Sequence, residues 1–283
     1  MDAERDQRSD QVLEMGSLPD YASPPVVEVV VGLQFAPLTG LTLPHVGLYW
    51  ARIRDEFVRA EEQAPIAHLV ELPTPRRDEG SAFRVQTKPE LPRTWFVSED
   101  GNRILQVQRD RFLHNWRKMR EEDQYPRFPE VRDAFFRHWE MFCDFLKESG
   151  APAPQVDQCE LTYVNLIPSG RAWQSTADLA KLFNCFAWHP RTGFLPQPES
   201  VRWAMQFALP KETGRLYTEA LPVLAGAGNV PAIRFTLTAR GMPKGEATPD
   251  ALKQWLELAR VWIVRGFADL VTEYSDTLWE RRI

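Results

Sequence analysis

The sequence is poor in cysteine and has no apolar run long enough to cross a membrane. Its 283 residues include only Cys143, Cys159 and Cys185, with no C-x-x-C pair. This pattern predicts buried free thiols in a reducing cytoplasm rather than a disulfide framework. No apolar segment approaches about 20 residues, so we expect no membrane span. The acidic first 20 residues lack the apolar core of a secretory signal.

Lysine is scarce as well. The 34 basic residues comprise 7 Lys and 27 Arg, and 39 acidic residues bring the formal net charge to −5. This acidity argues against a protein that coats nucleic acid or anionic membrane through bulk charge. A hydrophobic content of 43% excludes a disordered chain. A chain of this length buries about three quarters of its surface, so it needs no disulfide or metal to fold.

Common catalytic and cofactor-binding signatures are absent. The sequence contains no G-x-x-x-x-G-K-[S/T], G-x-G-x-x-G, G-x-S-x-G or H-E-x-x-H motif. His45, His68, His138 and His189 are scattered without ligand spacing, so we expect neither a metal site nor a cofactor. An enzyme with a dispersed site is not excluded.

The chain divides into an acidic tail, residues 1–20, and two similar halves, residues 21–150 and 151–283. The first half predicts a strand at 26–35, a helix at 42–57, strands at 81–88, 93–98 and 103–116, and a helix from Val131 that stops at Gly150. The second half predicts a strand at 158–167, a short helix capped by Ser175, strands at 201–209, 215–221 and 232–240, and a final helix of about 30 residues from Thr248.

This order predicts an α+β fold of two β-α-β(3–4)-α halves. Strands without intervening helices indicate an antiparallel sheet covered by helices on one face. The doubled unit resembles the fold of the TATA-box-binding protein, and the helix-grip fold is the alternative. Either resemblance concerns element order and implies no particular function.

The segment that could carry function is rich in arginine. Residues 103–120 hold six basic residues against Asp110 alone, a local charge of +5. Read as one strand, the segment would place Gln106, Gln108, Asp110, Phe112 and His114 on one face, and Leu105, Val107, Arg109, Arg111 and Leu113 on the other. Such arginines suit carboxylate or phosphate recognition.

Three interpretations of this segment stay open. The first is a solvated strand whose arginines pair with acids elsewhere. The second is a nucleic-acid surface on which aromatic rings stack against bases. The third is an enzyme site near Asp110 and His114. The candidate binding residues are Gln106, Gln108, Arg109, Asp110, Arg111, His114, Asn115, Trp116, Arg117, Tyr125 and Arg127.

Two glutamates occupy matching places in the first strand of each half. Glu28 and Glu160 could face each other across the pseudo-symmetry, as an acid–base dyad or metal site requires. The alternative, which we prefer, is that each is satisfied by an arginine or lies at a margin of the sheet.

Four motifs carry a family resemblance. Pro24-Pro-Val-Val-Glu-Val29, Gln106-Val-Gln-Arg-Asp-Arg-Phe112 with Asn115-Trp-Arg117, Tyr125-Pro-Arg-Phe128 and Glu160-Leu-Thr-Tyr-Val-Asn165 occur in this order. In that order and spacing they resemble a family of sporadically distributed, uncharacterised bacterial proteins. The patchy distribution of that family implies horizontally transferred cargo, such as phage-defence or toxin–antitoxin modules, and it supplies no catalytic residues to transfer.

These observations predict a cytoplasmic protein without a catalytic centre. We expect a binding or regulatory subunit that acts with a protein partner. A nucleic-acid or nucleotide binder that uses the 103–128 segment is one alternative, and an enzyme with a dispersed site near Asp110 and His114 is the other.

Overall fold

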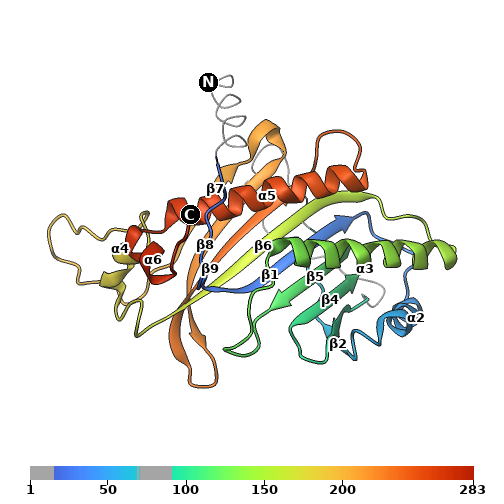
Figure 1. Ribbon diagram of the computed structural model, residues 1–283, viewed down its shortest axis with the longest axis horizontal. Coiled ribbons are helices and arrows are strands. Elements are labelled where there is room, and N and C mark those ends of the chain that lie inside the picture. The colour runs from blue at the N-terminus through green and yellow to red at the C-terminus, as the bar shows by residue number, and fades with distance from the viewer. Residues whose placement is uncertain (1–15, 69, 71–90) are drawn as a thin grey trace. The chain divides into compact units, whose positions relative to one another are not determined.

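The computed structural model describes residues 16–68, 70 and 91–283. The described chain is α+β, as the sequence predicts: five α-helices accompany one nine-stranded antiparallel sheet (Figure 1). The strand order is β2-β3-β4-β5-β1-β6-β9-β8-β7. Contacts group the chain into two compact units. We name them the β1–β5 unit, residues 28–161 and 240–256, and the β7–β9 unit, residues 16–27, 162–239 and 257–283.

The first half of the chain supplies most of the β1–β5 unit. Its elements are β1 (Val26–Phe35), α2 (Leu43–Ile53), β2 (Arg59–Gln63), β3 (Arg93–Val97), β4 (Arg103–Gln108), β5 (Arg111–Arg117) and α3 (Phe128–Glu148). The predicted β1, β3 and α3 are confirmed. The strand β2 was not predicted, and the strand expected at 81–88 falls outside the described residues.

The prediction of one continuous strand from Arg103 to Trp116 is wrong. The chain turns at Arg109 and Asp110, and β4 and β5 pair as an antiparallel hairpin with Gln108 opposite Arg111. The two turn residues reset the alternation of side chains. Gln108 and Arg111 therefore share a face, whereas Phe112 and His114 point to the other.

The face of β5 that carries Phe112 is the helix-facing side of this unit. The Phe112 ring lies 5.9 Å from Phe135, 5.4 Å from Trp139 and 5.1 Å from Phe142, all on α3. Figure 1 shows α3 running alongside these strands. The period of apolar residues that predicts α3 thus reflects a helix stripe packed on an aromatic core.

Gly32 on β1 faces Leu113 on β5, and a side chain at position 32 would require the buried side chain of Leu113 to move. A Cβ placed on Gly32 would lie 2.1 Å from Cδ2 of Leu113. We expect Gly32→Ala to destabilise the fold by about 1–3 kcal/mol through overpacking. Urea unfolding monitored by circular dichroism measures the change.

Two further variants make this test specific. Leu113→Ala in the Gly32→Ala background should recover part of the lost stability, because it removes the clashing methyl group. Gly47 on α2 is the matched control, since it is exposed and a Cβ there meets nothing within 4 Å. Gly47→Ala should stabilise the helix by about 0.5–1 kcal/mol. Equal effects at both glycines would contradict the steric explanation.

The second half of the chain supplies most of the β7–β9 unit. Its elements are β6 (Val156–Pro168), α4 (Leu179–Leu182), β7 (Trp203–Ala208), β8 (Gly214–Ala225), β9 (Val230–Gly241), α5 (Pro249–Leu270) and α6 (Glu273–Leu278), with short 3₁₀ turns at Thr176–Asp178 and Pro210–Glu212. The predicted capping box of Ser175 and Asp178 is confirmed, although the helix that follows is short.

The final helix is not continuous, contrary to the prediction. It breaks after α5 because the N–H of Thr272 donates to the carbonyl of Leu182, outside the helix. Thr272 is extended and its hydroxyl accepts a hydrogen bond from the N–H of Ser275, so it caps α6. Trp279, which directly follows α6, is buried, and its ring lies 5.3 Å from that of Phe267 on α5.

Candidate functional site

The sheet of the β1–β5 unit has an unusually polar face opposite α3. Six side chains make up this surface, which we call the polar face: Glu28, Gln34, Gln106, Gln108, Arg111 and Asn115. The strand pairings place all six on one side, and all but Glu28 are buried. Buried polar groups must be hydrogen-bonded, so their partners decide what this face does.

Most of these partners lie within the face itself and on the neighbouring strand β3. The Oε1 atom of Gln106 accepts from Arg93 at 2.7 Å and from the Trp95 indole at 2.9 Å. Its amide donates to Asn115 at 2.7 Å, and Asn115 donates to Glu28 at 2.6 Å. The chain of hydrogen bonds therefore joins β3, β4, β5 and β1 side by side.

The remaining partners belong to a short segment after β2. Gln108 bonds both the N–H and the carbonyl of Ile66, each at 2.8 Å. Arg111 donates to the carbonyl of Ala67 at 2.9 Å. We call residues 66–68 the strap, because two predicted binding residues hold its backbone against the sheet.

The side chain of His68 completes the attachment of the strap. Its Nδ1 lies 2.9 Å from Asp110 and its Nε2 lies 3.1 Å from Asp157 on β6. Each ring nitrogen of His68 therefore faces a carboxylate of the protein, so neither is directed at an open site where a ligand could exchange a proton with it.

Arg111 is the most deeply buried charge of the polar face, with an exposed fraction of 3%. It also donates to Gln34 Oε1 at 2.7 Å, while its Nε has no hydrogen-bond partner. Burial lowers the pKa of its guanidinium, and nearby Glu160 and Asp110 oppose that change. The acidic neighbours thus keep a buried arginine charged inside the fold.

His114 lies on the helix-facing side, away from Asp110. Its ring stacks on His138 at 5.4 Å and meets Phe57 edge-on at 6.5 Å. Among the described residues, neither nitrogen of this buried ring has a hydrogen-bond partner. The expectation that Asp110 and His114 share one face of a continuous strand is therefore wrong.

Beside His114, the ring of His138 is tied to a charged cluster at the rim. Its Nε2 lies 3.1 Å from Glu56, which also pairs with Arg103 and Arg137. Burial lowers the pKa of His138, although Glu56 opposes the change. Burial and then the positive charge of His138 lower the pKa of His114 well below its usual value.

The other candidate residues of the Arg-rich segment are also engaged. Arg109 donates from Nε to the carbonyl of Leu41, and Arg117 donates to that of Gly101. Trp116 is buried, and its ring lies 5.3 Å from that of Tyr125. Arg127 is exposed and stands just before α3. Four of the six basic side chains of residues 103–120 (Arg103, Arg109, Arg111 and Arg117) therefore bond groups of the unit itself, whereas Lys118 and Arg120 are exposed.

The paired glutamates also have separate partners. Glu28 accepts from Asn115, and Glu160 accepts from Arg240 Nε at 2.7 Å. The prediction that an arginine satisfies Glu160 is confirmed. In the part of the chain that the structure describes, no cluster of three or more His, Cys, Asp or Glu residues could hold a metal ion.

The cysteines are free, but they are not all buried as predicted. Cys159 is buried, Cys143 is half-buried and Cys185 is exposed. Burial raises the pKa of Cys143 to about 12 and also raises that of Cys159. Neither thiol is therefore ionised near neutral pH.

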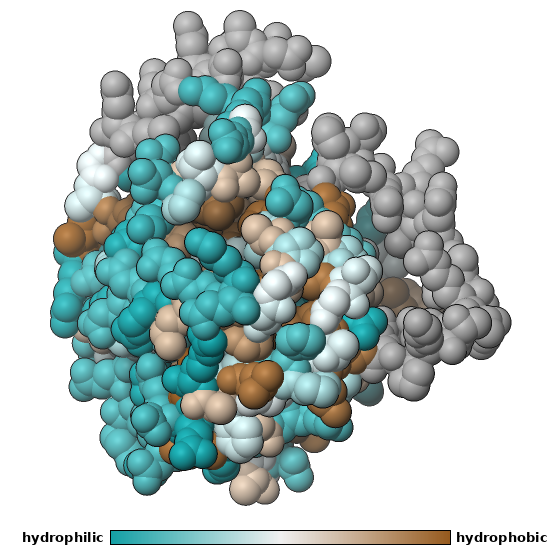
Figure 2. Space-filling model, turned by 90° about the vertical axis from the view of Figure 1, so that its right-hand side faces the viewer, coloured by the Kyte–Doolittle hydropathy of each residue, from teal (hydrophilic) through white to brown (hydrophobic). Residues whose placement is uncertain are grey.

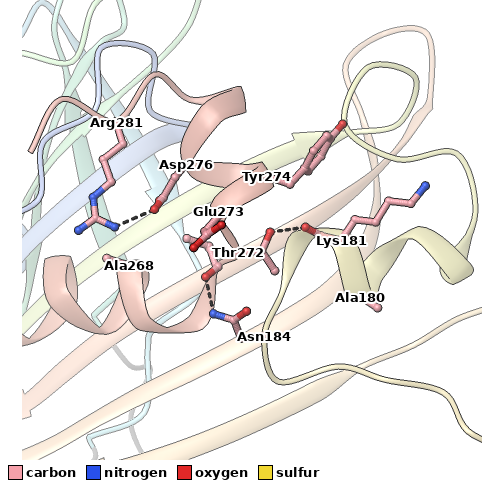
Figure 3. A pocket seen from close by; sticks show the side chains of 10 residues that line it. Ala180, Lys181, Asn184, Ala268, Thr272, Glu273, Tyr274, Asp276 and Arg281 are labelled. Atoms are coloured by element: carbon pink, nitrogen blue, oxygen red, sulfur yellow. Dashed lines mark hydrogen bonds and ion pairs between the residues drawn. The ribbon is translucent and has the colours of Figure 1, made fainter.

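A shallow cleft of about 620 Å³ lies between α4 and α6 in the β7–β9 unit (Figure 3). Its polar groups largely pair with one another. Asp276 accepts from Arg281 at 2.7 Å, and Asn184 donates to the carbonyl of Val271 at 2.6 Å. Figure 3 shows the side chain of Lys181 extending away from these pairs. The cleft therefore presents no convergent set of unpaired polar groups.

The edge strand β7 is the least protected part of the β7–β9 unit. It ends the strand order, and four of its six residues, Ala204, Gln206, Phe207 and Ala208, are exposed. None of its six residues is charged. The opposite edge, β2, carries Arg59, Glu61 and Glu62 instead, and charges of this kind deter pairing with a further strand.

The backbone of β7 shows which groups point outward. The N–H of Leu209 donates to Gly214, so Trp203, Met205 and Phe207 direct their N–H and carbonyl groups toward β8. By alternation, those of Ala204, Gln206 and Ala208 point away from the sheet. Within the described residues no strand pairs with them.

Sequence analysis missed several side chains of the polar network, among them Arg93 and Trp95 on β3. His68 and Asp157 stand far from the Arg-rich segment in the chain, and only the fold brings them to Asp110. Gln34 could have been noticed as a polar residue near the end of an apolar strand.

On the face of the molecule that Figure 2 shows, hydrophobic side chains are dispersed among hydrophilic ones and form no continuous patch in the coloured part of the surface. No helix of the described residues is long and apolar enough to cross a bilayer. Comparison with known proteins adds no assignment, because no protein-family model and no curated protein matches the chain.

Proposed function

We propose that this chain is a non-enzymatic binding protein that acts with a protein partner. The partner adds an extended segment to the outward edge of β7. The observation that carries this proposal is the uncharged, exposed edge of β7, with the N–H and carbonyl groups of Ala204, Gln206 and Ala208 pointing outward. Strand addition supplies affinity through main-chain hydrogen bonds, and such an edge is its template.

The polar face supports a binding role over catalysis. Its polar side chains form hydrogen bonds with neighbouring strands and with the strap, and both nitrogens of His68 face carboxylates. These groups are therefore engaged within the fold and do not point toward a substrate. An enzyme with a site near Asp110 has less support, because His114 lies in the core instead of beside Asp110.

A nucleic-acid binder is also less well supported. Arg111 is buried and Arg103 pairs with Glu56, so neither guanidinium is directed at a phosphate backbone. Binding through counterion release would need several such contacts. If this alternative were right, affinity for DNA or RNA would fall steeply with salt concentration and would depend on Arg109 and Arg111.

Proline on the outward edge of β7 tests the proposal. Gln206→Pro removes one outward N–H without touching the bonds to β8, because Gln206 directs no backbone group inward. The unaltered tagged chain should co-purify with a stoichiometric amount of its protein partner. With Gln206→Pro, we expect the amount of that co-purified partner to fall at least tenfold. Affinity purification from the native host, with quantitation of each eluted protein, measures this loss.

Gln206→Ala is the matched control, because it shortens the side chain but keeps the N–H. It should retain the partner. Unfolding curves for both variants should resemble that of the unaltered chain, which separates lost binding from lost folding. A partner retained equally by Gln206→Pro and Gln206→Ala would overturn the proposed edge.

The origin of the fold belongs to the same proposal. We infer that the two halves descend from one duplicated β-α-β(3–4)-α unit resembling the TATA-box-binding protein. The strand order supports this: β1 and β6 are neighbours, with β5-β4-β3-β2 beyond one and β9-β8-β7 beyond the other. The helix-grip fold remains the alternative.

The cellular setting is also a proposal. A cytoplasmic location is supported by the free cysteines, which suit a reducing compartment. A role in a phage-defence or toxin–antitoxin system rests on the motif resemblance alone. The identity of the adjacent genes tests it.

A further inference from the structure

We infer that the strand added to β7 is β7 of a second copy of this chain, so that the protein forms a twofold dimer. This inference rests on the proposed function, because it names the occupant of the same edge. It requires that the six residues Trp-Ala-Met-Gln-Phe-Ala be complementary to themselves in antiparallel pairing.

Hydrogen-bond geometry selects one register for the pairing. Outward groups must meet outward groups, and the registers that pair at least two outward residues place the twofold axis through Gln206, Met205 or Phe207. An axis through Phe207 would leave Ala204 opposite residue 210, outside the strand, and would form only about four hydrogen bonds within β7. An axis through Gln206 pairs Ala204 with Ala208, Gln206 with itself and Ala208 with Ala204. All three outward residues then find partners within β7, and the pairing forms about six hydrogen bonds by the antiparallel rule.

An axis through Met205 is less favourable. It would pair Ala204 with Gln206 but would leave Ala208 opposite residue 202, which lies outside the strand. Only about four hydrogen bonds would then form within β7. The axis through Gln206 is therefore the register we assign.

Side chains also match in this register. On the side that bears the buried residues Leu216 and Ala220, Phe207 stands opposite Met205 of the second copy. Phe207 is 37% exposed in the single chain, and a thioether against its ring would cover part of that surface. A dimer thus buries the exposed aromatic ring of the edge.

The other face of β7 is equally compatible. Ala204 and Ala208 are small and stand opposite each other, so they leave room for the approach. Gln206 stands opposite Gln206 of the second copy, and an amide can both donate and accept across the axis.

The pairing brings no like charges together within the strand. The nearest charged residue, Arg202, already pairs with Glu219 at 3.1 Å. An antiparallel edge that is uncharged, small on one face and apolar on the other fits a second copy of itself more directly than a partner of strongly charged sequence.

A cysteine at the axis tests this inference. Directly opposed residues of a hydrogen-bonded pair have Cα atoms about 5.5 Å apart, which is within the range of a disulfide. In a Cys185→Ser background, which removes the exposed native thiol, we expect Gln206→Cys to give a covalent dimer under mild oxidation. The dimer would run at twice the chain mass of 32.7 kDa on non-reducing gels.

Met205→Cys in the same background is the matched control. It is adjacent in the strand but faces Phe207 of the second copy, so it should not cross-link to itself. Light scattering on the unaltered chain should show a mass that rises toward the dimer with concentration, and Gln206→Pro should abolish that rise. Gln206→Ala should leave it intact.

Each result decides between the two proposals. A concentration-independent monomer, or cross-linking by Met205→Cys and not by Gln206→Cys, would overturn the assigned dimer. If the chain is monomeric while Gln206→Pro still loses a different protein partner, the proposed function stands and only the second copy is wrong. Dimerisation unaffected by Gln206→Pro would place the dimer interface elsewhere and would overturn the assigned dimer.

Discussion

Replacement of Arg111 by methionine should destabilise the protein by about 3–5 kcal/mol, the usual cost of removing one partner from a buried charged network. The variant removes the guanidinium that donates to Gln34 Oε1 and to the carbonyl of Ala67. It also removes a buried positive charge that interacts with nearby Glu160 and Asp110. We therefore expect loss of folding rather than a selective loss of binding.

Equilibrium unfolding in urea measures this effect. Arg54→Met is the matched control, because Arg54 is exposed, and it should change stability by less than about 0.5 kcal/mol. Gln34→Leu combined with Arg111→Met should cost less than the sum of the single changes, since the two side chains share a hydrogen bond. A fully folded Arg111→Met protein with altered ligand binding would show that the polar face is a binding site after all.

Replacement of His114 by leucine should remove much of the acid sensitivity of the fold. His114 is buried without a hydrogen-bond partner, and its pKa is lowered first by burial and then by His138. In the unfolded chain this histidine takes up a proton at its ordinary pKa of about 6.5. Stability from the lowered pKa is therefore present above about pH 6.5 and is lost as the pH falls below it.

The size of the effect follows from the same linkage. If the buried ring stays neutral, protonation of this histidine in the unfolded chain alone lowers the free energy of unfolding by about 2 kcal/mol between pH 7 and pH 5. His114→Leu should remove about this much of the decline, and the slope that remains belongs to groups such as His138. At pH 7.5 the variant should keep its stability, because an apolar side chain needs no hydrogen bond there.

Urea unfolding at pH 7.5, 6 and 5 tests this prediction. His189→Leu is the control, because His189 is exposed and should leave the pH dependence unchanged. An identical decline in the His114→Leu variant and the unaltered protein would show that His114 is not the residue that titrates.

Apolar periodicity predicted most of the elements, because it reports burial within one element. The apolar stripe of α3 and the β-branched residues of β1 each pack one face of their element against the core. Elements without that signal were missed. The strand β2, Arg-Ala-Glu-Glu-Gln, is exposed, and only pairing with β3 makes it a strand.

The turn in the Arg-rich segment was missed for a local reason. Hairpins of two residues are usually marked by glycine or asparagine, and Arg109-Asp110 has neither. The alternation of polar residues continued through the turn and was assigned to one strand. That single error exchanged the faces assigned to Arg111 and His114 and placed Asp110 and His114 on the same face.

The candidate site was only partly predictable from the sequence. Gln106, Gln108, Asp110, Arg111 and Asn115 were selected because polar residues interrupt strand patterns, and the fold does gather them. Their role depends on His68, Asp157 and the backbone of the strap, which reach them from other parts of the chain. Contacts of this kind follow from the packing of the sheet, not from any local pattern.

Hydrogen exchange along β7 tests the central claim most directly. In the dilute chain, the amides of Ala204, Gln206 and Ala208 should exchange rapidly, whereas those of Met205 and Phe207 should be protected by β8. When the complex forms, protection should rise at Ala204, Gln206 and Ala208 specifically. Unchanged exchange at these three amides in the complex would contradict binding through the edge of β7.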